Sequence, residues 1–358
     1  MTRTTKKAAA KLNAAISGAV KRFAPPESLT VDEWADKHRR LSPESSAEAG
    51  PWRTKRTPYL EEPMKAFTDP KVHKIVMVAA SQVGKSELEL NIIGYIIDQD
   101  PGSILYVHPT IDDARKFSRL RVAPMIRDSK PLKAKVHDVK AKDSGITILQ
   151  KSFPGGMLTL TGSNSASALA STPARYIIGD ERDRWAVSAG TEGDPWALAE
   201  ARQATFYNAK AVEVSTPTIK GNSNIETSFF QGTQERWCHR CPECGEYHEI
   251  VFDDIKFEPE ATRIRGKKTW KLRGGISWAC PGCGCLTRLD RQGKGADTQY
   301  QYGEQPEPTL QRGMDRTGRN TVSRVCHRGV AGGISLLHHR RNGENSGAQP
   351  RRPTWRGY

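Results

Sequence analysis

Long apolar runs are scarce in this sequence of 358 residues. The two longest, at residues 75–80 and 92–97, fall far short of the roughly 18 to 20 apolar residues that a membrane-spanning helix needs. The first residues include lysines but no continuous apolar core of the kind that a signal peptide has. We therefore expect a cytoplasmic protein that does not contact a membrane.

Cysteine is almost missing outside one short segment. Six of the seven cysteines lie between residues 238 and 285, mostly in Cys-x-x-Cys pairs. This arrangement disfavours an extracellular disulfide framework and favours metal binding in a reducing compartment.

Charge is unevenly distributed. Residues 1–24 hold six basic side chains and no acidic one, and we interpret them as a basic N-terminal arm. Residues 293–358 hold ten arginines, one lysine and eleven glycines without apolar periodicity, which is typical of a low-complexity tail, disordered or frame-shifted. The net charge of +15 favours a polyanionic partner, although a protein that merely runs basic would share it.

Apolar strand-like runs alternate with helical periodicity along residues 25–236. The expected strands and helices, in chain order, are 74–80, 86–97, 103–108, 112–126, 176–179, 195–206 and 211–215. A hairpin is expected at 145–161, with its turn at Pro154-Gly155-Gly156. Because the strands are nearly all apolar, the pattern predicts an α/β domain whose parallel sheet is covered on both faces.

A phosphate-binding loop stands between the first strand and the first helix. Residues 79–86 match its pattern, except that Ala79 replaces the first glycine. In such a loop the backbone N–H groups bind phosphates, Lys85 neutralises the β and γ oxygens, and Ser86 offers its hydroxyl to Mg²⁺. The predicted nucleotide-binding residues are Ala79, Ser81, Gln82, Val83, Gly84, Lys85 and Ser86.

Two adjacent carboxylates, Asp180 and Glu181, follow the strand at 176–179. The carboxyl ends of parallel strands form the ligand edge of such a sheet. We expect Asp180 to hold Mg²⁺, and Glu181 to be catalytic, together with Lys85, by polarising the water that attacks ATP. A solvated acidic turn is the alternative. With the phosphate loop, the paired acids indicate a P-loop NTPase motor domain, for which we expect the ASCE type.

Other positions carry weaker indications. Ser215 and Thr216 end a strand, where nucleic-acid motors couple hydrolysis to movement, but an ordinary turn has the same composition. Trp52 and Tyr59 are suited to stack on adenine and equally to core packing. Basic clusters that can contact DNA phosphates, or can be solvated faces, are Lys37–Arg40, Arg53–Arg56, Arg115–Arg121, Lys130–Lys142 and Arg263–Lys271.

Residues 237–292 read as a small β-rich module. Two Cys-Pro-x-Cys-Gly turns separated by 35 residues predict a zinc ribbon with Zn²⁺ bound by Cys241, Cys244, Cys280 and Cys283. Four thiolates leave no open coordination position, so the ion would be structural. Spare ligands that can substitute are Cys238, Cys285, His239 and His248.

Together these residues resemble the large terminase subunit of tailed double-stranded-DNA phages, in the lambda-type gpA family. The resemblance covers about residues 25–292. Its ordered matches are Leu29–Asp36, Gly50–Tyr59, Gln82–Ser86, Val107–Thr110, Gly162–Ser165, Asp180, Glu181, Asp183, Arg184 and the two cysteine pairs. An ordered run of matches is more specific than any one motif.

The resemblance implies a packaging motor that translocates double-stranded DNA into a prohead in the host cell cytoplasm. Its implied partners are a small terminase subunit, the portal and further copies of this chain. Ser81 stands where several lineages place an arginine finger, so the finger is not assigned. Its candidates are Arg115, Arg119, Arg121, Arg182 and Arg184. Nothing after about Gln292 resembles the family's nuclease domain, and we expect no DNA cleavage by this chain.

Two other functions stay open. One is a helicase-like nucleic-acid ATPase, which would need a second motor domain. The other is a non-catalytic zinc-ribbon DNA-binding or assembly protein with a defunct motor.

Overall fold

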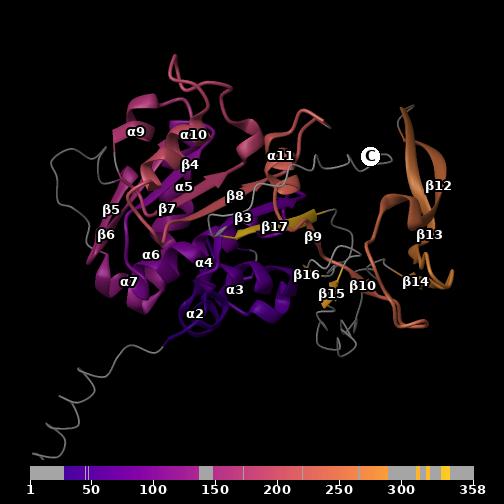
Figure 1. Cartoon of the computed structure of the whole chain (residues 1–358). Coiled ribbons are helices and arrows are strands. Elements are labelled where there is room, and N and C mark those ends of the chain that lie inside the picture. The colour runs from indigo at the N-terminus through magenta and orange to yellow at the C-terminus, as the bar shows by residue number, and fades with distance from the viewer. Residues whose placement is uncertain are drawn as a thin grey trace, which may run out of the picture.

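An eight-stranded sheet forms the centre of the protein (Figure 1). The computed structural model describes residues 28–136 except 45 and 47, residues 148–288 except 172, 220, 265 and 266, and the segments 312–314, 320–322 and 332–338. The strand order is β5-β6-β4-β7-β8-β3-β17-β9. The bounds are β3 Val72–Ala79, β4 Ile104–His108, β5 Gln150–Phe153, β6 Gly156–Gly162, β7 Tyr176–Asp180, β8 Lys210–Ser215, β9 Glu235–Arg236 and β17 Gly332–His338.

The five central strands, β6, β4, β7, β8 and β3, are parallel, whereas β5, β17 and β9 pair antiparallel. This confirms the predicted α/β fold with a mostly parallel sheet. Strand β8 lies between β3 and β7. Val78 of β3 pairs with Ser215, and Asp180 of β7 pairs with Val214, so the three strands end at one edge.

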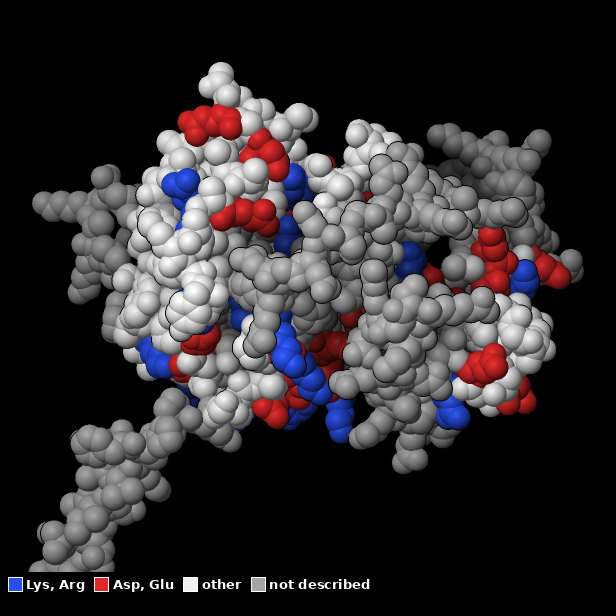
Figure 2. All heavy atoms as spheres, viewed as in Figure 1, with Lys and Arg blue, Asp and Glu red and all other residues white. Residues whose placement is uncertain are grey.

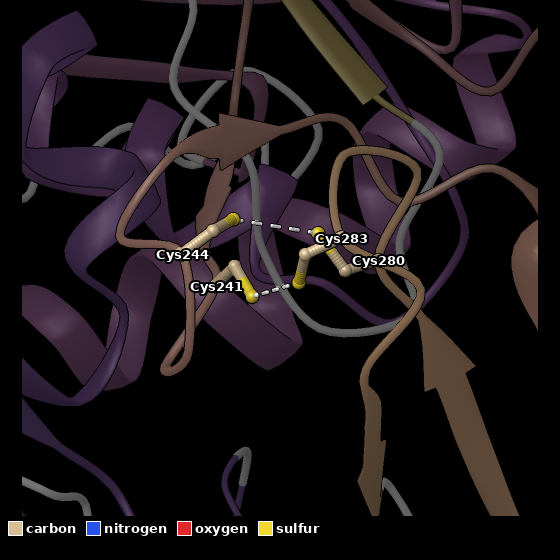
Figure 3. A group of neighbouring side chains, drawn as sticks. All are labelled: Cys241, Cys244, Cys280 and Cys283. Carbon is tan, nitrogen blue, oxygen red and sulfur yellow. Dashed lines mark hydrogen bonds between the residues drawn. The ribbon is translucent and has the colours of Figure 1, made fainter.

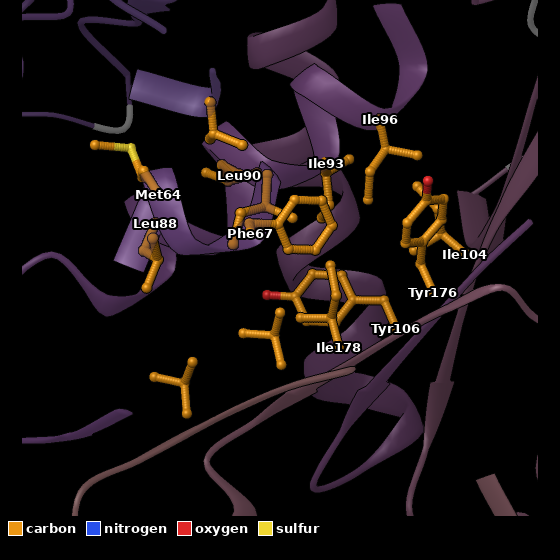
Figure 4. Close-up of a cluster of buried hydrophobic side chains, with 14 of the residues drawn as sticks. Met64, Phe67, Leu88, Leu90, Ile93, Ile96, Ile104, Tyr106, Tyr176 and Ile178 are labelled. Atoms are coloured by element: carbon orange, nitrogen blue, oxygen red, sulfur yellow. The ribbon is translucent and has the colours of Figure 1, made fainter. Parts of the chain in front are cut away.

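Helices cover both faces of the sheet. Those packed around the larger core are α2 (Val31–His38), α3 (Glu61–Thr68), α4 (Lys85–Asp98), α5 (Ile111–Phe117), α6 (Ala123–Asp128) and α7 (Lys130–Lys135). On the other face lie α9 (Ala166–Ser171) and α10 (Pro195–Glu200), while α11 (Asn224–Phe230) packs on Val76. Strand β4 shows why its first four residues are apolar or aromatic: Ile104 and Tyr106 face the first core (Figure 4), and Leu105 and Val107 face the second.

Helix α2 is fixed onto α4 by one aromatic side chain. The backbone N–H of Thr30 donates to the Glu33 carboxylate over 2.8 Å, a hydrogen bond that caps the N-terminus of α2. Trp34 is fully buried, and its Nε1 donates to Asp98 at the end of α4 over 2.8 Å. A Cβ atom at Gly94 would lie 2.2 Å from the Trp34 ring, so only glycine allows this approach. The lead-in segment thus positions the helix that follows the phosphate loop.

Most predicted elements are confirmed, with two adjustments. The expected helix at 112–126 is divided into α5, a π-helical turn at Ser118–Val122 and α6. Pro124 has no N–H to continue the helical hydrogen bonding, and this favours the irregular turn before it. The helix expected to reach 206 ends at Glu200 and continues as a 3₁₀ turn. The hairpin at 145–161 forms as β5 and β6, with its turn where we predicted it.

The prediction that residues 293–358 are a disordered tail is not confirmed. Strand β17 within this segment pairs with β3 along Gly332–His338, and β15 (Arg312–Met314) pairs with β16 (Asn320–Val322). The run Ile334–Leu337 is locally apolar and meets an edge of β3 that β8 leaves open. Composition averaged over the whole tail conceals a strand of this length. The predicted basic arm at 1–24 lies outside the described residues.

The cysteine-rich region forms small antiparallel sheets, as predicted. Strand β10 (His239–Arg240) pairs with β11 (Tyr247–His248), and β12 (Ile255–Ile264), β13 (Lys267–Ala279) and β14 (Leu286–Arg288) form a three-stranded sheet. Near the N-terminus, β1 (Arg40–Leu41) pairs with β2 (Gly50–Pro51). Among the described helices none combines the length and apolarity that crossing a bilayer requires.

Candidate functional site

The loop between β3 and α4 has the backbone of a phosphate-binding loop. Gln82 and Gly84 adopt left-handed conformations, with φ of 65° and 85°. Gly84 directly precedes α4, so the free N–H groups of the first helical turn face the loop. Tyr59 donates its hydroxyl hydrogen to the carbonyl of Val83 over 2.9 Å. Tyr59 thus supports the loop, whereas Trp52 is buried in the core and donates to Thr54 over 3.0 Å.

Lys85 brings the predicted motifs together. Its side chain is buried, and Nζ donates to Thr216 Oγ1 over 2.6 Å and to the carbonyl of Ala80 over 3.1 Å. The carboxylate of Glu181 lies 3.5 Å from the same Nζ. The ends of β3, β7 and β8 therefore meet around one ammonium group.

The two predicted acids differ in environment. Asp180 is buried at the end of β7, with one carboxylate oxygen 3.5 Å from Nδ1 of His108. Glu181 follows in a left-handed conformation with φ of 48°, which is uncommon outside glycine and is found often at functional sites. Ser86, the second residue of α4, is half-buried. A carboxylate and a hydroxyl suit Mg²⁺, because Mg²⁺ prefers oxygen ligands.

A buried acid behind these residues was not predicted. Glu89 is completely buried in α4 and accepts a hydrogen bond from the Tyr106 hydroxyl over 3.0 Å. The Tyr106 ring lies 4.3 Å from the ring of His108, which links this acid to Asp180. Burial, and then the charge of Asp180, raise the pKa of Glu89 well above its ordinary value. In the sequence Glu89 is merely one polar residue between two leucines.

Replacing Glu89 by glutamine should flatten the pH dependence of stability. Because the pKa of Glu89 is raised in the folded protein, its contribution to stability is present below pH 4.5 and is lost as pH rises towards the raised pKa. Above pH 4.5 we expect the free energy of unfolding of Glu89→Gln to fall less steeply, by up to about 1.4 kcal/mol per pH unit. Urea unfolding between pH 5 and neutrality would measure this. An unchanged slope, or the same flattening in the exposed-acid control Glu192→Gln, would contradict it.

The five candidate arginines lie in different surroundings. Arg121 pairs with Glu87 at 2.7 Å, and Arg182 is buried against Asp194 at 2.9 Å. Arg115 is paired with Asp112, and Arg119 is exposed. Arg184 lies beside a predicted site residue, with Nε 3.8 Å from a Glu181 oxygen and 65% of its side chain exposed. Of the five candidates, Arg184 is thus the one with an ion pair to Glu181.

Two cysteine turns of matching geometry face each other (Figure 3). In each turn the glycine N–H donates to the carbonyl of the first cysteine, over 3.0 Å from Gly245 to Cys241 and 2.8 Å from Gly284 to Cys280. Both glycines are left-handed, with φ of 77° and 76°. The ligand atoms of the four predicted cysteines lie within 4.8 Å of one another. This arrangement fits a tetrahedral thiolate site.

The spare ligands divide into near and distant ones. Cys285 Sγ lies 3.2 Å from Cys241 Sγ, closer than the 3.6 Å that separates Cys241 from Cys283. His248 joins Cys244 and Glu246 in a second group of potential ligands. Cys238 is buried and His239 packs edge-on against Trp278 at 5.2 Å between ring centroids. Cys285 is therefore the strongest alternative to a member of the predicted set.

The parallel sheet, the phosphate loop and the acids at the end of a neighbouring strand define a P-loop ATPase. The sequence profile of the family described as phage terminase large subunit gpA, ATPase domain, matches residues 46–299. The chain belongs to this family, as the resemblance predicted. It is 28% identical over 231 residues to the large terminase subunit of Escherichia phage lambda, and 28% identical over 232 residues to that of Enterobacteria phage P21.

Each of these two alignments covers 64% of this chain and 36% of the relative, so the chain spans about a third of the length of these relatives. Among solved structures, the large terminase of bacteriophage HK97 covers 57% of this chain and 41% of its own, with 14% identity and a TM-score of 0.46.

Proposed function

We propose that this chain is the ATP-hydrolysing motor of a phage packaging machine and drives double-stranded DNA into a prohead. The observation that carries the proposal is the meeting of three motifs at Lys85, whose Nζ contacts Thr216 and lies 3.5 Å from Glu181. Membership of the terminase ATPase family supports the DNA-packaging role.

Each residue around the loop takes one role in hydrolysis. Lys85, now bonded to protein oxygens, would turn to the β and γ phosphates. Ser86 and Asp180 would hold Mg²⁺, which neutralises charge that develops on the phosphates. Glu181 would orient the attacking water and accept its proton. Ser215 and Thr216 would report the state of the γ-phosphate to the rest of the motor.

The partners follow from charge and family. A net charge of +15 suits DNA, and we propose a small terminase subunit, the portal and further copies of this chain as the other partners. On the face drawn in Figure 2, described basic and acidic side chains are interspersed and form no single basic stripe. Within the predicted cluster Lys37–Arg40, Arg39 is not available to contact DNA, because it is buried and pairs with Glu87 at 2.9 Å. We therefore assign DNA binding to no single cluster.

The remaining assignments belong to the same proposal. Residues 25–236 form the motor domain and residues 237–292 a zinc ribbon that holds Zn²⁺ through Cys241, Cys244, Cys280 and Cys283. DNA cleavage by this chain is still not expected. The acids after residue 292 lie outside the described residues, so that expectation stays a prediction from sequence.

ATP hydrolysis with and without double-stranded DNA tests the proposed function. We expect double-stranded DNA to raise the rate of ATP hydrolysis, because a translocating motor couples hydrolysis to the DNA that it holds. The Lys85→Ala variant, purified in parallel, controls for contaminating ATPases. Strand separation accompanying hydrolysis would favour the helicase-like alternative. DNA binding by wild-type protein that hydrolyses no ATP would favour the non-catalytic one.

A further inference from the structure

The short turn after the acidic strand is bonded to a distant segment through Asp183. Oδ2 of Asp183 accepts from the backbone N–H of Thr218 over 2.9 Å and from its hydroxyl over 3.3 Å. Oδ1 accepts from the backbone N–H of Ile225 over 2.8 Å. The N–H of Asp183 itself donates to Ser215 Oγ over 3.1 Å. One residue thus makes four hydrogen bonds, to the end of β8, to the segment that follows it and to the start of α11.

The hydrogen bonds of Asp183 attach the segment 216–225 to the acidic turn. Within this segment Thr216 accepts from Lys85 of the phosphate loop over 2.6 Å. Ile225 lies in the first turn of α11 and packs with Phe229 against Val76 of β3. The segment therefore touches the loop, the acidic turn and the strand that leads into the loop. The contact between this segment and the acidic turn is made by Asp183.

The chemistry of the contact favours a fixed geometry. Hydrogen bonds from N–H groups to an ionised carboxylate are shorter and stronger than those between neutral groups. The two backbone N–H groups use different oxygens of Asp183, so both must be acceptors. Glu181 lies two residues earlier in the same turn, in a left-handed conformation. A shift of Asp183 would therefore move the residue proposed to act on water.

We propose that Asp183 is a positioning residue that holds the turn carrying Glu181 and the segment 216–225 together as one unit. This inference rests on the proposed function for its consequence in hydrolysis. Its structural part, the link between turn and segment, can be tested separately. Because misplacement of a catalytic group by about an ångström costs up to about a hundredfold in rate, loss of the link should affect turnover more than nucleotide binding.

The test uses Asp183→Asn, which keeps the size of the side chain but leaves one acceptor oxygen. The NH₂ group of the asparagine is a donor, so it cannot accept the hydrogen bond from one of the two backbone N–H groups. We expect kcat for ATP hydrolysis to fall about tenfold or more, while the affinity for a fluorescent ATP analogue changes less than about twofold. Amide hydrogen exchange should become faster at residues 216–225.

Ser223→Ala is the matched control. Ser223 Oγ accepts from the N–H of Glu226 at the start of α11, and in the described part of the chain it makes no hydrogen bond to the acidic turn. Its removal should loosen α11 locally and leave kcat within about twofold of the wild type, since capping losses are local. An equal loss of kcat in both variants would assign the effect to α11 stability and overturn the proposal. So would normal kcat in Asp183→Asn.

Hydrogen exchange separates this proposal from the proposed function. If the wild-type chain hydrolyses no ATP, the proposed function fails, and exchange at 216–225 still decides the structural link. Faster exchange in Asp183→Asn than in Ser223→Ala at the Thr218 amide would support the link. Unchanged exchange at that amide in Asp183→Asn would overturn it.

Discussion

Glu181→Gln is expected to bind ATP as tightly as the wild type and to hydrolyse it at least about a hundredfold more slowly. Glutamine has nearly the same size as glutamate but cannot take a proton, and general base catalysis contributes about 10² to 10⁴ in rate. Glu181 lies 3.5 Å from Lys85 Nζ, at the edge where three strands end. Equilibrium binding of a fluorescent nucleotide and single-turnover hydrolysis measure the two effects separately.

Lys85→Ala should differ from Glu181→Gln in nucleotide binding. The lysine supplies the positive charge for the β and γ phosphates, so its loss should weaken binding as well as slow turnover. Glu192→Gln, which changes an exposed acid elsewhere, should behave as the wild type in both assays. Hydrolysis at the wild-type rate by Glu181→Gln would remove this residue from the catalytic role.

Removal of zinc should unfold the cysteine-rich module. Binding to structural sites supplies on the order of 10 kcal/mol in small domains with little core. The hydrophobic cluster in the described part of this module has four buried members, Cys241, Ile250, Trp278 and Cys280. We expect about one zinc per chain by elemental analysis. Chelator should increase proteolysis between residues 237 and 288 and leave the motor domain resistant.

Cysteine variants identify the zinc ligands. The double variant Cys241→Ser with Cys280→Ser should lose zinc, because it removes one ligand from each turn. Cys285→Ser should retain it, despite the 3.2 Å between Cys285 and Cys241 sulfurs, if the predicted four are the ligands. Wild-type protein without zinc, or zinc retained by the double variant, would contradict the site. Loss of zinc in Cys285→Ser would place Cys285 in the ligand set.

Local sequence patterns predicted the motor's elements because its strands are short apolar runs bounded by turn residues. Strand β7 and the loop before α4 follow directly from such runs. The sequence predicted Lys85 and Thr216 as members of two separate motifs, but the contact of Lys85 with Thr216 and its distance from Glu181 needed the fold. Sequence gave no indication of Glu89 as a buried acid, because burial depends on Tyr106 in another strand.

Two further features also depend on contacts between distant residues. Strand β17 is recognisable only beside β3, since its apolar run is brief and lies in a glycine- and arginine-rich segment. Asp183 looks like one charge among several in the sequence, and its partners lie 35 and 42 residues away. Hydrogen bonds between such distant residues produce no periodic pattern in the sequence, so they cannot be predicted from it.

The packing of α4 limits which parts of this machine can move. Leu88 to Ile97 are buried except for Tyr95, and the Trp34 ring occupies the space beside Gly94 where a side chain would stand. Closely packed interiors resist gradual deformation, so we expect α4 to keep its position when nucleotide binds and is hydrolysed. Thr218 and Ile219, in contrast, are exposed beyond the end of β8. In the proposed motor, any movement after hydrolysis should therefore carry the acidic turn and the segment 216–225 together, while α4 stays in place.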